Sequence, residues 1–263
     1  MDRNPTGRRI GRKYGPCAVI KTGANPARKP MIRAAGAGSM DGMTPRTSRL
    51  IPAGLIALTL IPAAGGAVRL GSLASGGPVT PGNERFFAMP VPVVLHIVAA
   101  LIYCVLGAFQ FAPRFRRRRP RWHRTAGWVL VPAGLTVALT GVWMTLAYEF
   151  PAVDGTAVKI ERLIVGGVLA AAIVLAIRAV RRRDFAGHRA WMIRAYALAQ
   201  GAGTQAFTQV PWMLLAGELD ATGRAVALGG GWLINALIAE WIIRRKKRPA
   251  RVPARPRYEV ATS

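Results

Sequence analysis

Apolar residues dominate six stretches of the chain, and short links rich in charged residues, proline and glycine separate them. A helix needs about 20 mostly apolar residues to cross the hydrocarbon core of a bilayer. The stretches cover approximately 50–67, 89–112, 125–149, 160–179, 190–214 and 225–243. Since only helices and closed barrels satisfy their backbone groups in lipid, this pattern predicts an all-α membrane protein, a bundle of six transmembrane helices.

Basic residues gather on alternate links between these stretches. The links at 113–124 and 178–189 are rich in arginine, and eight more Lys or Arg follow residue 243. The intervening links hold few basic residues and a similar number of acidic ones. Because Lys and Arg near the ends of spans remain on the cytoplasmic side, six spans with both termini in the cytoplasm fit every link.

The net charge takes its meaning from this arrangement. The chain carries 37 Lys or Arg against 11 Asp or Glu, which gives a formal net charge of +26. A soluble protein with that charge would be expected to bind nucleic acid. Here the mean hydropathy is +0.27 and the arginines flank apolar spans. We therefore predict no nucleic-acid partner, and expect the lipid bilayer and anionic lipid headgroups to be the partners.

Two basic tails flank the predicted membrane domain at 46–245. Residues 1–45 are rich in Gly, Pro and basic residues, and residues 246–263 are rich in Pro and Arg, so both tails are predicted to be disordered. Two interpretations of the first tail stay open. Either translation starts at a later methionine, such as Met43, or the tail is real and lies on anionic headgroups.

Signatures of soluble enzymes are missing from the sequence. It contains no phosphate-binding glycine loop, no nucleophile elbow and no helical zinc motif. Cys17 lies in the basic tail and Cys104 in an apolar stretch, so they are poorly placed to form a disulfide or a metal site. We identify no catalytic residue and no metal ligand, and a non-enzymatic role is favoured.

Polar side chains inside the spans are the candidate binding residues, because ionisable groups in a bilayer are costly and usually face the bundle interior. On the second span, His96, Tyr103 and Gln110 fall within about 60° of one another on a helical wheel. The fifth span has a similar stripe that includes Arg194 and Gln205. These stripes are candidates for the lining of a substrate cavity near the middle of the membrane.

The sixth span adds Asn235 and Glu240 to the predicted polar interior. Glu240 and Arg194 lie at similar depths near the cytoplasmic side, so we predict an ion pair between them, since either charge alone would be expensive there. Arg162 lies one turn into the fourth span from the other side. By depth, we expect Glu149 to be its partner.

Small residues follow His123 on the third span and His188 on the fifth, in stripes at helical spacing. Such stripes usually allow helices to pack closely. The same smooth surface could accept a flat macrocycle, with the histidine at its end as a ligand. Both interpretations stay open.

The two arginine-rich links also resemble each other. Aligning the arginines of RRRRPRWHRTAGW and RRRDFAGHRAWM brings His123 onto His188 and Arg124 onto Arg189, at an offset of 65 residues. The second and third spans and the fourth and fifth spans are then either two parallel hairpin repeats or a chance match, because arginine runs match easily.

Several longer motifs, GAFQFAPRFRRRRPRWHRTAGW, TGVWMT, HRAWMIRAYALAQGAGTQ and GWLINALIAEW, cover much of the region from about 50 to 243. In these motifs the chain resembles a family of predicted bacterial multi-pass membrane proteins catalogued as a domain of unknown function. The resemblance implies a six-span protein of the bacterial cytoplasmic membrane and brings no activity with it. The polar positions that belong to this pattern are His96, Gln110, His123, Arg124, His188, Arg189, Arg194, Gln205, Asn235 and Glu240.

A looser resemblance is to the six-helix, two-haem transmembrane cytochromes b. It implies that His123 and His188 hold one b-type haem near the cytoplasmic face, with Arg124 and Arg189 on the propionates. His96 would belong to the second pair of ligands. It finds no histidine partner on the fourth span, which leaves at most one haem.

Three functions are consistent with these patterns. The first is a non-enzymatic scaffold, sensor or accessory protein, in which the polar stripes only pack helices. The second is an electron-transfer protein with one haem between His123 and His188. The third is a small-molecule or proton-coupled transporter lined by the stripes that contain His96 and Arg194.

Overall fold

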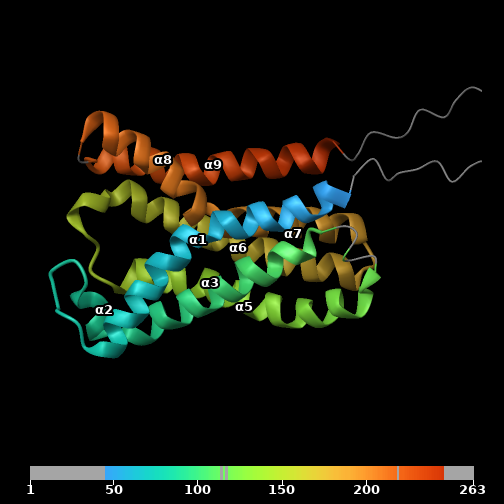
Figure 1. Ribbon diagram of the computed structural model, residues 1–263, viewed down its shortest axis with the longest axis horizontal. Helices are drawn as coiled ribbons and strands as arrows, with labels where there is room; N and C mark the ends of the chain where they lie inside the picture. Colours follow the sequence, from blue (N-terminus) through green and yellow to red (C-terminus); the bar gives the residue numbers. More distant parts are fainter. Residues whose placement is uncertain (1–44, 113–114, 116–117, 218, 246–263) are drawn as a thin grey trace, which may run out of the picture. The chain divides into compact units, whose positions relative to one another are not determined.

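Figure 1 shows the computed structural model, which describes residues 45–112, 115, 118–217 and 219–245. The predicted tails lie outside these residues, apart from residue 45, and so do Met43 and Cys17. The part of the chain that is described forms helices and no strand, which confirms the all-α prediction. The α-helices are α1 (Pro45–Ser75), α2 (Glu84–Ala88), α3 (Pro90–Gln110), α5 (Pro120–Ala147), α6 (Gly155–Arg181), α7 (Phe185–Ala199), α8 (Gly201–Ala216) and α9 (Ala221–Arg245), and a short 3-10 helix, η1 (Ala152–Asp154), precedes α6.

Local sequence explains where several helices begin. Pro90 and Pro120 stand at the first positions of α3 and α5, where a helix needs no backbone N–H and the fixed φ of proline suits helical geometry. Asp184 precedes α7, and its Oδ1 accepts a hydrogen bond of 2.8 Å from the backbone N–H of Gly187. A carboxylate in that position caps the helix by binding one of its unpaired N–H groups.

Five of the helices in the described residues are long and apolar enough to cross a membrane, by length and composition. They are α3, α5, α6, α9 and the Arg49–Ser75 part of α1. The chain is thus a multi-pass membrane protein, and five of the six predicted spans correspond to single helices.

The fifth predicted span, 190–214, was expected to be one helix, and this was wrong. The structure has two helices there, α7 of 15 residues and α8 of 16 residues, which meet at Gln200. Two glycines bring the start of α8 into close contact with its neighbours. A Cβ at Gly201 would lie 2.2 Å from Trp232 of α9, and one at Gly203 would lie 2.2 Å from the backbone oxygen of Leu58 of α1. Hydropathy alone carries no signal for such a break.

The helices pack mainly as neighbours in sequence: α3 on α5, α5 on α6, α6 on α7, and both α7 and α8 on α9, while α1 packs on α3 and α8. The core lies where α3, α5, α6 and α7 meet. Tyr103, which is 1% exposed, lies against Gly134, where a Cβ would come within 2.6 Å of its ring. Gly107 leaves similar room for the ring of Tyr196. At these positions, small residues serve close helix packing.

The helix ends gather at two opposite ends of the bundle (Figure 1). One end, which we call the arginine end, contains the start of α1, the end of α3, the start of α5, the link from α6 to α7 and the last turn of α9. The other, the η1 end, contains α2, η1, the end of α8 and the start of α9. The helical hairpins α3–α5 and α6–α7 thus open in the same sense, and a sequence duplication between them stays a prediction.

Candidate functional site

Two cavities lie inside the helix bundle on either side of His96. The first, which we call the α6 cavity, has a volume of about 360 Å³ and is lined by residues of α2, α3, α5, α6, α7, α8 and α9. The second, the α1 cavity, has a volume of about 310 Å³ and is lined by residues of α1, α3, α7 and α8. The two share four lining residues, Val93, His96, Ala199 and Ala202. His96 therefore belongs to the wall that separates two hollow spaces.

The ring of His96 is oriented by a contact with α5. Its Nδ1 lies 3.0 Å from Oγ1 of Thr140. The Thr140 hydroxyl already donates to the backbone oxygen of Thr136 at 2.5 Å, so we infer that it accepts a hydrogen bond from Nδ1–H of His96. Nε2 of the neutral ring is then the acceptor. The prediction that His96 faces the bundle interior is confirmed.

The break between α7 and α8 lies beside both cavities. Ala199 and Ala202 on either side of the break line the two cavities, and Gln200 itself lines the α1 cavity. The Gln200 side chain is 3% exposed and holds three helices together. Its Nε2 donates to the hydroxyl of Tyr196 at 2.8 Å and to the backbone oxygen of Leu55 on α1 at 3.2 Å. The Tyr196 hydroxyl in turn donates to the backbone oxygen of Cys104 on α3 at 2.6 Å.

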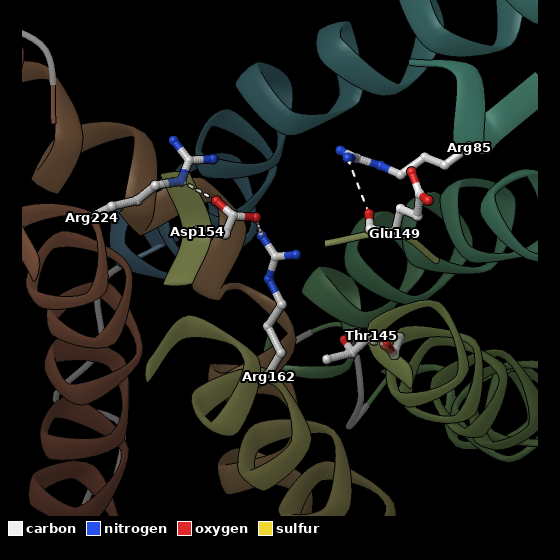
Figure 2. Close-up of polar contacts among 7 residues, drawn as sticks. Arg85, Thr145, Glu149, Asp154, Arg162 and Arg224 are labelled. Carbon is white, nitrogen blue, oxygen red and sulfur yellow. Dashed lines mark hydrogen bonds and ion pairs between the residues drawn. The ribbon is translucent and has the colours of Figure 1, made fainter. Parts of the chain in front are cut away.

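A cluster of charged residues lies where the α6 cavity reaches the η1 end (Figure 2). Asp154, which is 2% exposed, lies between two guanidinium groups. Its Oδ2 is 3.2 Å from Nη2 of Arg162, and its Oδ1 pairs with Nε of Arg224 from α9. Nearby, Nη1 of Arg85 donates to the backbone oxygen of Glu149 at 3.4 Å. Arg85, Glu149 and Arg162 line the cavity.

The expectation that Arg162 pairs with Glu149 was wrong, because Asp154 binds it instead. Side chains of a helix tilt toward its N-terminus, and Asp154 stands immediately before the first residue of α6. Depth in the membrane was therefore a poorer guide than the direction of the arginine side chain.

Tyr148 closes the same end of the cavity. Its hydroxyl donates to the backbone oxygen of Met89 at 2.6 Å, which ties the end of α5 to the start of α3. Burial raises the pKa of Tyr148, against a hydrogen bond with the backbone at Val93 and the charge of Arg85, which lower it. The hydroxyl therefore stays protonated at neutral pH and available as a donor.

Of the residues predicted to line a substrate site, His96 and Gln205 line the α6 cavity. Nε2 of Gln205 donates to the backbone oxygen of Leu228 at 3.0 Å. Tyr103 is packed in the core. Asn235 joins α9 to α7 and α8, because it accepts from Thr204 at 2.9 Å and donates to the backbone oxygen of Ala197 at 3.0 Å.

Arg194 and Glu240 form the predicted ion pair, away from the residues that line the two cavities. Nε of Arg194 lies 2.5 Å from Oε1 of Glu240, and Nη2 lies 3.2 Å from Oε2. Arg244 adds a longer contact of 3.6 Å to the same carboxylate. The pair joins α7 to α9 toward the arginine end, and the prediction is confirmed.

The predicted haem ligands lie on α5 and α7, toward the arginine end. Nδ1 of His123 pairs with Oε1 of Gln110, and Nδ1 of His188 lies 2.9 Å from the backbone oxygen of Ala176. Arg124 and Arg189 follow these histidines on the same two helices. Among the residues that the structure describes, no group of three or more His, Cys, Asp or Glu could hold a metal ion. Haem binding stays a prediction.

Sequence reasoning missed four residues that shape this region: Thr140, Asp154, Gln200 and Arg224. Asp154 and Arg224 lie in links that were examined only for the sign of their charge. Gln200 carried a usable signal, since it precedes GAG in an otherwise apolar stretch, where glycine weakens a helix by up to about 1 kcal/mol relative to alanine.

Comparison with known proteins gives a family and no function. The family model described as "Predicted membrane protein (DUF2306)" matches residues 93–243, more than half of the chain. The match runs from α3 into α9 and includes the four residues that line both cavities. No curated protein matches the chain. No solved structure matches it either. The resemblance to an uncharacterised membrane family is confirmed, and nothing in these comparisons shows the resemblance to cytochromes b.

Proposed function

We propose a carrier function for this chain, which belongs to the DUF2306 family of predicted membrane proteins: it binds a small molecule beside His96 and moves it across the bacterial cytoplasmic membrane. In this proposal α7 and α8 together make one crossing, since each alone is shorter than the roughly 20 residues a span requires. The chain then crosses six times, and the arginine end faces the cytoplasm together with both termini.

The observation that carries the proposal is the helix break at Gln200 between two cavities. In many transporters, substrates bind near the membrane midplane where a crossing helix is interrupted, because unwound backbone is tolerated there only beside a cavity. Here the interruption adjoins both cavities, and residues on either side of it line them. A scaffold needs neither a cavity nor a broken helix beside it.

The small residues at the break support movement of α8. Four residues, Val93, His96, Ala199 and Ala202, line both cavities. The two that α7 and α8 contribute, Ala199 and Ala202, have only a methyl group as side chain. A modest rotation of α8 about Gln200 would open one cavity toward the other. His96 would then meet the ligand from either side.

Cysteine accessibility tests this proposal. Ala202→Cys is made in a chain whose own cysteines are replaced (C17S, C104A), and a membrane-impermeant maleimide is applied to intact cells and to inside-out vesicles. A carrier predicts labelling from both sides, because the shared wall is exposed alternately. Leu139→Cys, on an exposed position of α5 that would face lipid, is the matched control and should react from neither side.

Labelling from the outside alone would contradict carriage and leave a binding protein that opens to one side. Labelling of Ala202→Cys no faster than that of Leu139→Cys would contradict an accessible cavity altogether. The distribution of the two labelled variants in the membrane fraction confirms that both fold and insert.

A further inference from the structure

We propose that the ligand of the α6 cavity is a small amphiphile with one carboxylate, and that Arg162 and Arg85 recognise the carboxylate. This inference rests on the proposed function, since it assigns a ligand class to the same cavity. The observation behind this proposal is that the cavity has mostly apolar walls and two guanidinium groups, those of Arg85 and Arg162, at the η1 end.

Most of the cavity wall is apolar. Between α3 and α9 it is formed by side chains such as Val137, Ala138, Val165, Leu169, Leu198 and Trp232. The volume of about 360 Å³ lies at the lower end of the range of about 300–1,000 Å³ found for small-molecule sites. A ligand of this size would bury an apolar body against these walls, and the hydrophobic effect would supply much of the affinity.

The charge of Arg162 is only partly compensated. Asp154 is its acidic partner, and the single carboxylate of Asp154 is shared with Arg224. Two guanidinium groups therefore meet one carboxylate. Arg162 lines the cavity, whereas Arg224 is not among the lining residues. Of the two arginines that share Asp154, Arg162 is thus the one that a ligand in the cavity can reach.

Arg85 adds a second cation at this end of the cavity. Its guanidinium donates to the backbone oxygen of Glu149 and lies 4.7 Å from the centre of the Phe86 ring. Among the charged residues that line the cavity, two cations, Arg85 and Arg162, face one anion, Glu149.

The remaining acid on this part of α6, Glu161, lies close enough to Arg162 for their charges to interact. Its carboxylate packs against α9, where a Cβ on Gly229 would come within 2.6 Å of Oε1 of Glu161. It is not among the lining residues. One carboxylate on an apolar body therefore matches both the charge and the walls, and a cationic amphiphile would meet like charge.

Three eight-carbon probes of different charge test the inference: octanoate, 1-octanol and octylamine. Each is titrated below its micellar concentration into the full-length protein in lipid nanodiscs, and Kd is measured calorimetrically. Because octanoate can accept charge-assisted hydrogen bonds and octanol cannot, octanoate should bind at least about tenfold more tightly than octanol. Octylamine should bind most weakly of the three.

Arg162→Gln should reduce the octanoate preference to less than about threefold and leave octanol binding unchanged, since octanol makes no ion pair. Arg224→Gln is the matched control, because it removes the other partner of the same aspartate and lies outside the cavity lining. It should reduce the octanoate preference less than Arg162→Gln does, because it keeps Arg162 in the cavity but leaves the Asp154 carboxylate to that arginine alone. Arg85→Gln provides a second variant if Arg162→Gln fails to reach the membrane, and it should weaken octanoate in the same direction.

The outcomes separate this inference from the proposed function. If octanoate and octanol bind equally well and Gly141→Leu blocks both, the assignment of a carboxylate ligand is wrong. The proposal that the cavity binds a small molecule is then still supported. Gly141→Ala is the control for that blocking variant, because a Cβ at Gly141 lies at an ordinary 3.5 Å from Cε1 of His96. If Arg162→Gln and Arg224→Gln reduce the octanoate preference equally, the assignment of the carboxylate to Arg162 is also wrong. Binding of no probe would contradict both proposals.

Discussion

Neutralising Asp154 should destabilise the η1 end more than any other single change of charge there. Its carboxylate is 2% exposed and holds Arg162 at 3.2 Å and Arg224 from another helix. At 3.2 Å, two unit charges attract by about 5 kcal/mol for an effective dielectric constant of about 20. Asp154→Asn removes this attraction and leaves two guanidinium groups facing an amide of similar shape.

The expected loss is smaller than the Coulomb energy. The guanidinium side chains are 36% and 30% exposed, so water screens part of the attraction and hydrates the arginines once the aspartate is neutral. Breaking a fully buried pair costs about 3–5 kcal/mol. We therefore expect Asp154→Asn to lower the free energy of unfolding by about 2–3 kcal/mol.

The assay is reversible unfolding of the purified protein in mixed micelles, with increasing SDS and tryptophan fluorescence as the readout. Asp220→Asn is the matched control, since Asp220 also precedes a helix and accepts a hydrogen bond of 2.7 Å from the backbone of Gly223, but has no ion pair among the described residues. It should cost about 1 kcal/mol or less. The double variant Asp154→Asn with Arg224→Gln should recover part of the loss, because it removes one of the two unpaired cations.

A loss for Asp154→Asn no larger than that for Asp220→Asn would refute the reasoning, since the buried carboxylate would then contribute no more than a cap. A double variant as unstable as the sum of the two single variants would equally refute it. Strict additivity is expected only of residues that do not interact.

The remaining predictions concern packing and the second ion pair. Gly134→Ala places a Cβ within 2.6 Å of the Tyr103 ring and should cost about 1–3 kcal/mol in the same assay, whereas Gly127→Ala on the same helix meets no atom within 4 Å and should be neutral or slightly stabilising; equal effects would contradict close packing at Gly134. Glu240→Gln removes the acid from Arg194 where both side chains are about one third exposed, so the loss should be about 1 kcal/mol and should shrink with added salt; a larger, salt-independent loss would indicate a buried pair.

The two outcomes for ion pairs show why sequence reasoning succeeded at one end and failed at the other. Arg194 and Glu240 lie on helices that pack on each other, and equal depth was enough to predict their contact. For Arg162, depth suggested Glu149 and left out Asp154, because the path of the chain through η1 cannot be read from hydropathy. A link of a few residues can turn its side chains in several directions, and only packing selects one.

The haem hypothesis illustrates a further difficulty. Histidines at matching positions after two arginine-rich links suggested a pair of ligands. In the structure, His123 contacts Gln110 and His188 contacts the backbone oxygen of Ala176, and haem binding stays a prediction. The sequence spacing showed only that His123 and His188 occupy equivalent positions after the two arginine-rich links. It carried no information on which neighbour each imidazole meets.

The sequence by itself determined that this protein is all-α and multi-pass, because the cost of exposing peptide groups or charges to lipid forces long apolar stretches into helices. It also indicated which polar side chains face the bundle interior, since a helical wheel depends only on spacing. Only the tertiary structure decided that one stretch breaks at Gln200, that His96 stands between two cavities and that Asp154 joins two arginines. These features depend on contacts between residues far apart in the chain, where the absence of a Cβ or the direction of one side chain selects among arrangements of equal hydropathy.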